Sequence, residues 1–140
     1  LYSELARQDI VKARNYIARK NLQANEDNIR DFRETIFSGE TPELNHLTKS
    51  ADFYTLSSCR DLCFHAQEHR FTIHELQETL TSNKLKFLGF LLPQSNKSLY
   101  ENYFPEDKTQ TNLLNWGTFE EKYPNTFRGM YQFWVCKTEN

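Results

Sequence analysis

The chain has 140 residues, a length that fits one domain able to bury most of its apolar surface in a single core. Its formal net charge is -2, and Lys and Arg are scattered among Asp and Glu, which argues against a nucleic acid or membrane partner. No apolar run approaches the roughly 20 residues of a membrane helix, and the N-terminus lacks the pattern of a signal peptide. Three cysteines without a framework of spacings favour a reducing compartment, so we expect a cytoplasmic protein.

Helical periodicity dominates the first part of the chain. The sequence opens at Leu1, without an initiator Met, and runs at once into a helical pattern that Ser3 can cap, so we expect a piece of a longer protein. Thr72 and Glu75 form the pattern of a capping box, and Asn83 is the expected end of that helix. The predicted helices cover residues 3–20, 25–38, 57 into the Cys/His segment, and 73–83, with a loop at 39–50.

Two segments have the composition of strands. Residues 85–92 are apolar on both alternating faces apart from Lys86, which predicts a strand that is covered on both sides inside a sheet. Residues 130–136 are aromatic and β-branched, and a mainly helical stretch lies between the two strands. Because an isolated strand pair is marginal in water, we expect further strands or a partner to complete it. The predicted fold class is α+β, with a helical lid or regulatory region at 1–84 and strand, helical insertion and strand at 85–140.

The segment from Ser58 to Phe71 holds most of the reactive side chains of the chain. Its spacing offers Cys59, Cys63, His65 and His69 as possible zinc ligands. On a helix, however, His65 points well away from Cys63, so the four would converge only if the helix broke near His65. Because cysteine is among the most buried residue types, packing is the favoured interpretation and no metal is predicted.

Two other interpretations of the same segment concern catalysis and surface charge. Cys59 is the only cysteine placed near a helix N-terminus, but nothing in the sequence completes a nucleophilic triad around it. Proton transfer by His65, Glu68 or His69 at a substrate pocket is the stronger chemical hypothesis. The alternative is a surface lattice of ion pairs, in which each pair contributes little; its members would be Arg60, Asp61, Glu68 and Arg70.

The order of these segments resembles the C-terminal part of a class I S-adenosylmethionine-dependent methyltransferase. The resemblance rests on Asn83 to Phe90 and on Phe127 to Lys137, which correspond to the antiparallel last two strands of that family's sheet. It is closest to a bacterial group, some of whose members carry tetratricopeptide repeats. In that group, a motif like Leu1 to Arg7 follows the fifth strand, and one like Cys59 to Thr72 comes some helices later. At the position that Cys63 occupies in this chain, members of the group have an apolar residue.

The resemblance implies where a methyl acceptor would bind. Tyr2, Ser3 and Glu4 would follow the fifth strand and reach the edge of the sheet at which open α/β folds bind ligands. The insertion that carries Cys59 to Thr72 would fold over that edge as a lid. Because methyl transfer mainly requires positioning, with a base only where the acceptor carries a proton, one His or Glu suffices. The expected roles are catalytic for His65, Glu68 and His69, and substrate-binding for Tyr2, Ser3, Glu4, Arg60 and Arg70.

The cofactor half of such an enzyme is absent from these residues. That half needs a glycine-rich turn between a strand and a helix. Gly39, Gly89, Gly117 and Gly129 are isolated, and none follows a strand and opens a helix. We therefore expect S-adenosylmethionine to bind a core domain upstream in the same polypeptide, and this chain alone to lack cofactor and activity.

The aromatic residues between the two strands suggest an alternative. Tyr100, Tyr103, Trp116 and Tyr123 cover the sheet in the simplest interpretation, but an aromatic surface can also bind a protein. The alternative function is a non-catalytic regulatory or interaction module that docks on a methyltransferase core. The unpaired strands would also favour a homodimer of this fragment.

Overall fold

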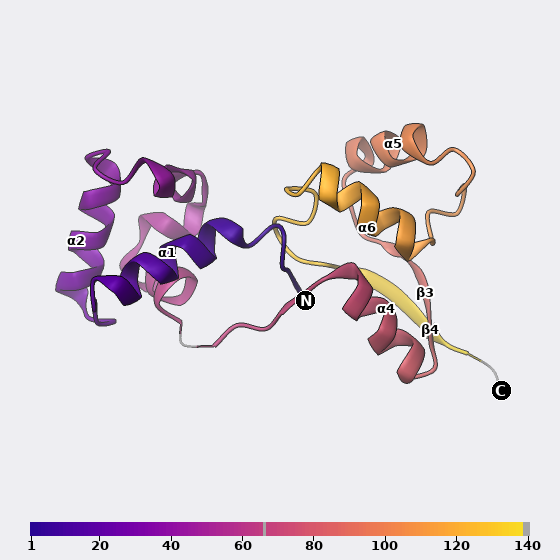
Figure 1. Cartoon of the computed structure of the whole chain (residues 1–140), viewed down its shortest axis with the longest axis horizontal. Coiled ribbons are helices and arrows are strands. Elements are labelled where there is room, and N and C mark those ends of the chain that lie inside the picture. Colours follow the sequence, from indigo (N-terminus) through magenta and orange to yellow (C-terminus); the bar gives the residue numbers. More distant parts are fainter. Residues whose placement is uncertain (66, 139–140) are drawn as a thin grey trace. The chain divides into compact units, whose positions relative to one another are not determined.

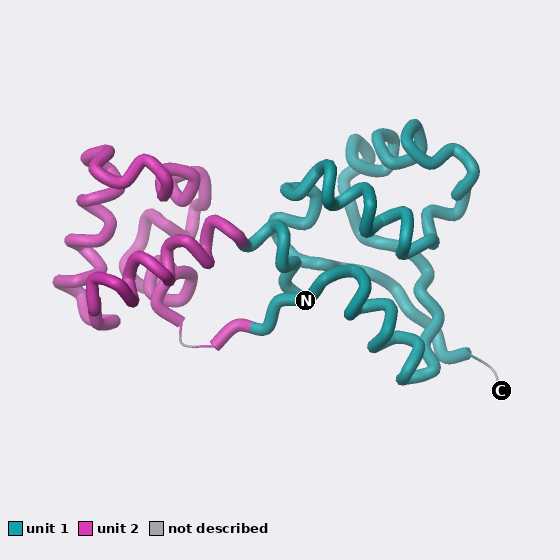
Figure 2. The backbone as a smooth tube through the Cα atoms, in the orientation of Figure 1, with its two compact units in different colours: residues 1–7, 69–140 teal, residues 8–68 magenta. Residues whose placement is uncertain are grey.

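The chain divides into two compact units, which Figure 2 colours separately. Each unit has its own cluster of buried apolar side chains. The structure, a computed structural model, describes residues 1–65 and 67–138. Unit 1 consists of residues 1–7 and the chain from residue 69 onward, and unit 2 consists of residues 8–68. Unit 2 is therefore an insertion into unit 1.

The described residues of unit 2 form helices and the turns that join them, without a strand. Its long helices carry apolar residues on one face, and Asn25 caps the second by accepting the amide of Asn28, as predicted. Phe32 lies at the centre, with ring centroids 6.3 Å from Phe53 and 5.5 Å from Phe64. The elements are α1 (Gln8–Arg19), α2 (Glu26–Phe37), η1 (Pro42–Lys49), η2 (Ala51–Tyr54), α3 (Leu56–Cys59) and η3 (Arg60–Phe64).

The predicted loop at residues 39–50 is wrong for most of its length. The chain forms the 3-10 helix η1 there, and Leu44 and Leu47 are both buried. A 3-10 helix has three residues per turn, so leucines three apart share one side, and that period differs from the α-helical one. The next helix begins after Thr55, whose hydroxyl accepts the amide of Ser58, rather than at Ser57.

Unit 1 mixes helices with short strands, which confirms the α+β class (Figure 1). The Thr72 capping box and the helix end at Asn83 are both present as predicted. The elements are β1 (Tyr2–Ser3), β2 (Arg70–Phe71), α4 (Ile73–Ser82), β3 (Leu85–Phe90), α5 (Gln94–Tyr103), α6 (Leu113–Lys122) and β4 (Phe133–Lys137).

β3 and β4 form an antiparallel pair, separated in the chain by the helical insertion, as predicted. The register shifts between Phe87 and Gly89, where β3 carries one extra residue opposite Trp134. Gly89 has φ +135°, a conformation that side chains rarely tolerate. The extra residue turns both Phe87 and Phe90, three positions apart, into the core.

The strand pair is covered on one face only. Phe87 and Phe90 pack with α4 and α6 in the core of unit 1. On the other face Leu88 is 46% exposed and Trp134 is 64% exposed. The prediction that β3 is covered on both sides is therefore wrong for the residues described, because both helices pack against the same face.

Helix α4 packs with the strands of unit 1, whereas the predicted boundary at residue 84 assigned it to the helical region 1–84. Its apolar stripe, Ile73, Leu76 and Leu80, lies in the same core as Phe87 and Trp116. Residues 1–7 also belong with the strands. Among the described residues, no helix combines the length and the apolar character needed to cross a membrane.

Replacing Gly89 by Ala tests the bulge. We expect Gly89→Ala to lower the free energy of unfolding by about 1–3 kcal/mol, because alanine is strained at this φ although no atom lies within 4 Å of the new Cβ. Gly117→Ala, inside α6, is the control and should raise stability by up to about 1 kcal/mol, since only the Ile73 side chain lies near, at 4.0 Å. Urea unfolding followed by tryptophan fluorescence measures both, and equal effects would contradict the assignment of strain to Gly89.

Candidate functional site

The two ends of the inserted unit leave unit 1 from neighbouring strands. β1 and β2 pair in parallel, with Tyr2 opposite Arg70 and Ser3 opposite Phe71. The amide of Glu4 continues this pairing by donating to the Phe71 carbonyl at 2.9 Å. The structure thus brings the predicted substrate-binding residues of the N-terminal segment next to Arg70, although the sequence separates them widely.

Side chains at the surface of this strand pair carry complementary charges. Arg70 Nε lies 2.8 Å from Glu4 Oε2, in a pair whose side chains are 27% and 37% exposed. The Arg7 guanidinium lies 4.4 Å from the centre of the Tyr2 ring. An aromatic ring, two cations and a carboxylate therefore lie together, and they can position a polar ligand.

Ser3 differs from its neighbours because it is buried. Its hydroxyl donates to Glu120 and accepts the amide of Ala6 at 3.0 Å, and the residue is 1% exposed. Its hydroxyl therefore fixes the N-terminal segment instead of facing a ligand, which corrects the predicted substrate-binding role. Buried hydroxyls require such partners.

Sequence reasoning missed the partners of Ser3. Glu120 is 2% exposed and also accepts a hydrogen bond from the Tyr131 hydroxyl at 2.6 Å. Burial raises the pKa of Glu120, and the two hydroxyl donors oppose this rise. Burial, with the bond to Glu120, also raises the pKa of Tyr131 far above its ordinary value. Glu120 is followed by Glu121 and Lys122, and consecutive charged residues are typical of an exposed helix face. The local sequence therefore gives no indication that Glu120 is buried.

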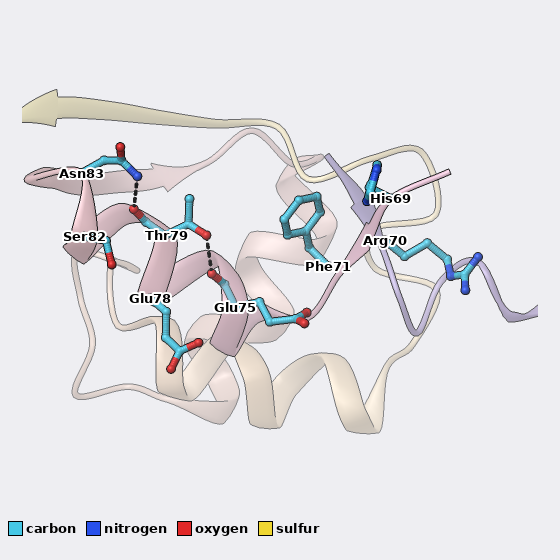
Figure 3. A pocket seen from close by; sticks show the side chains of 8 residues that line it. All are labelled: His69, Arg70, Phe71, Glu75, Glu78, Thr79, Ser82 and Asn83. Atoms are coloured by element: carbon cyan, nitrogen blue, oxygen red, sulfur yellow. Dashed lines mark hydrogen bonds between the residues drawn. The ribbon is translucent and has the colours of Figure 1, made fainter. Parts of the chain in front are cut away.

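A polar hollow of about 500 Å³ extends from β2 along α4 (Figure 3). The carboxylate of Glu75 belongs to the capping box, where it accepts a hydrogen bond from the Thr72 amide at 2.7 Å. His69 and Arg70 lie at one end of the hollow and Asn83 at the other. Its lining is His69, Arg70, Phe71, Glu75, Glu78, Thr79, Ser82 and Asn83. Of the predicted catalytic residues, His69 alone lines this hollow.

The other two predicted catalytic residues, His65 and Glu68, belong to unit 2 and have separate partners. The exposed His65 ring places Nδ1 2.6 Å from the Gln67 carbonyl oxygen and 3.4 Å from the Gln67 amide nitrogen. The side chain of Glu68 is only 4% exposed and lies 3.5 Å from Arg14. His65, Glu68 and His69 therefore do not share one site within either unit.

Arg14 connects three segments of unit 2. Its guanidinium donates to the Leu62 carbonyl at 3.1 Å from one nitrogen and contacts Glu68 from the other. The carbonyl belongs to η3, a wide helical turn whose backbone bonds differ from those of an α-helix. Arg14 thus holds the end of the Cys/His segment against α1.

The remaining residues of the Cys/His segment divide between surface and core. Arg60 is exposed, whereas Cys59 and Cys63 are buried in the core of unit 2. A hydrogen bond with Cys63, together with the charge of Arg33, lowers the pKa of Cys59 against the opposing effect of burial. Within residues 1–65 and 67–138, no three His, Cys, Asp or Glu side chains gather in the manner of metal ligands.

Comparison with known proteins gives no family assignment: no family model matches the chain, and a search of curated proteins finds no match.

Replacing Arg14 by Met tests its role as a structural connection. We expect Arg14→Met to lower the stability of unit 2 by about 1–3 kcal/mol, because hydrogen bonds to a charged group are lost while the apolar stem is kept. Arg19→Met, at an exposed position of the same helix, should stay within about 0.5 kcal/mol of the wild type. Urea unfolding followed by circular dichroism gives both values, and an equal loss in the two variants would argue against the connection.

Proposed function

We propose that this chain is the C-terminal, acceptor-side part of a cytoplasmic class I S-adenosylmethionine-dependent methyltransferase. The antiparallel β3–β4 pair with a helical insertion matches the order expected of the last two strands of that fold. The cofactor would bind a core domain upstream in the same polypeptide. No glycine-rich turn joins a strand to a helix among the described residues, so these residues do not fit the cofactor's adenosine and carboxylate groups themselves.

The observation that carries the proposal is the pairing of Leu1 with Tyr131. The Tyr131 amide donates to the Leu1 carbonyl at 2.7 Å, and the Leu1 nitrogen donates to the Tyr131 carbonyl at 3.2 Å. Two residues exchange both hydrogen bonds only in antiparallel strands. Residues upstream of Leu1 would therefore run antiparallel along the outer edge of β4.

The edge of β4 is suited to such a strand. Gln132 and Thr138, at either end of β4, bond backbone to backbone with the segment that contains β3. Since peptide groups alternate between the two edges of a strand, the odd-numbered residues face outward. The residues whose N–H and C=O groups meet an incoming strand are Phe133, Val135 and Lys137.

Unit 1 would supply the wall of the acceptor site. Tyr2, Glu4 and Arg70 lie together where the proposed upstream strand would end, and His69 lines the adjacent hollow. The methyl acceptor must be oriented at that point. Where the group that receives the methyl carries a proton, His69 can act as the base that removes it. Unit 2, inserted between β1 and β2, would be the lid, and the roles of Arg60, His65 and Glu68 there rest on the resemblance alone.

Hydrogen exchange tests the proposed strand. In a longer polypeptide that includes the residues before Leu1, the amides of Phe133, Val135 and Lys137 should gain at least tenfold protection relative to the 140-residue chain. The amides of Trp134 and Cys136, which face β3, serve as internal controls and should be protected in both. The longer polypeptide should also bind S-adenosylmethionine in calorimetry. Absence of both effects would refute the proposal.

Substitution of His69 tests the acceptor wall. In the longer polypeptide, His69→Ala should lower transfer of labelled methyl groups from S-adenosylmethionine about 10²–10⁴-fold, if the histidine is the base. The acceptors offered are fractions of a cell extract. His74→Ala, at an exposed position on α4, is the matched control. Cofactor binding should be unchanged in both variants, and unchanged transfer in His69→Ala would remove the histidine from the mechanism.

A second candidate function is an interaction module or a homodimer of this chain. The exposed Leu88 and Trp134 favour it, because an apolar strand face next to an open edge also fits another protein. Sedimentation of the 140-residue chain separates the two candidates. A stable dimer with protected Val135 amides would favour the second.

A further inference from the structure

We propose that Glu120, Ser3 and Tyr131 form a proton-linked latch that holds the N-terminal segment, residues 1–7, on unit 1. The latch goes beyond the proposed function and does not depend on it, because every group in it belongs to unit 1. It makes the attachment of Tyr2 and Glu4 respond to pH.

The latch joins three segments through a single carboxyl group. The Ser3 hydroxyl donates to one oxygen of Glu120, and the Tyr131 hydroxyl donates to the other at 2.6 Å. All three residues are at most 2% exposed. Backbone bonds between Leu1 and Tyr131 and between Glu4 and Phe71 flank the cluster. Detachment of the segment would therefore expose Glu120 to water.

Within the described part of the chain, no cationic side chain bonds to Glu120; the Leu1 ammonium group of the latched segment donates instead to the Tyr131 carbonyl at 3.2 Å. The groups that act on its pKa besides burial are the two hydroxyls. From α4, Glu75 acts on Tyr131 and adds a further negative charge. From α5, the Tyr100 hydroxyl is bonded to Asp107, and on α6 itself Glu121 and Lys122 are exposed, with Lys122 bonded to Tyr103.

Both protonation states of Glu120 can be satisfied in this geometry. The ionised carboxylate accepts from Ser3 and Tyr131. The protonated acid keeps the Tyr131 bond and donates its own proton to the Ser3 oxygen, once that hydroxyl rotates its hydrogen away. Because Glu120 is buried and no cation bonds to its carboxyl group, burial favours the neutral form of that group.

The sign of the pH effect follows from linkage. The pKa of Glu120 is raised in the latched state, whereas in the detached state it returns to its ordinary value near 4.5. The latched state therefore binds the proton more tightly, and the latch is strongest at low pH. As the pH rises from 4.5 to the raised pKa, the equilibrium constant for detachment increases about tenfold per pH unit, and above that pKa it levels off.

The test is hydrogen exchange of the Glu4 and Tyr131 amides in the whole chain between pH 4 and 8. After correction for the intrinsic pH dependence of exchange, the protection of these two amides in the wild type should fall about tenfold per pH unit between pH 4.5 and the raised pKa of Glu120. In Glu120→Gln, whose amide can accept from Tyr131 and donate to Ser3, protection should not change with pH. Glu121→Gln, one residue along the same helix, should keep the wild-type slope.

Three results would overturn the latch: a flat wild-type profile, the same slope in Glu120→Gln, or loss of the slope in Glu121→Gln. If Glu120→Gln does not fold, titration of the Glu120 carboxyl carbon by NMR in the wild type decides instead. A midpoint above 4.5 supports the latch, and a midpoint at or below that value refutes it. None of these results depends on cofactor binding or on methyl transfer.

Discussion

Unit 1 depends on the packing of aromatic rings against one face of the β3–β4 pair. Two strands alone are marginal in water, so a hydrophobic face must supply the stability. Phe90 does this most directly, with its ring centroid 5.3 Å from Trp116, 4.5 Å from Phe127 and 5.8 Å from Tyr131. Tyr131 joins this core to the buried carboxyl of Glu120. The apolar core and the attachment of the N-terminal segment are therefore parts of one packed structure.

The same one-sided packing leaves Trp134 exposed, and β3 is the one strand that pairs with β4 among the described residues, so the other edge of β4 is open there. Natural proteins usually protect such edges, because an unpaired strand invites association with other chains. Leu1 already pairs with Tyr131 at one end of this edge. A strand continuous with Leu1 would be aligned before it paired, so its closure would cost much less entropy than recruiting a separate molecule. This difference in cost is the physical reason to prefer completion within one polypeptide over a homodimer.

Local signals in the sequence predicted much of the fold. The Asn25 cap, the Thr72 capping box and the strand predicted at 85–92 depend on neighbouring residues, and all three are present, the strand as Leu85–Phe90. The parallel pair of β1 and β2 was not foreseen, since each strand has two residues and the Glu4–Arg70 contact spans 66 positions. The division into two units likewise arises from contacts distant in sequence, which periodicity does not report.

The candidate site was harder to predict because burial decides what each polar residue does. Ser3 and Glu4 are adjacent, yet the first is buried against Glu120 and the second pairs with Arg70 at the surface. Exposed ion pairs weaken as salt screens them, whereas a buried hydroxyl–carboxyl contact responds to the protonation of the carboxyl instead. The contact of Ser3 with Glu120 thus attaches the start of the inserted unit to α6, whereas the pair of Glu4 with Arg70 attaches that start to β2, where the unit ends. Salt would therefore weaken the connection between the two ends of the insertion without acting on the contact with α6.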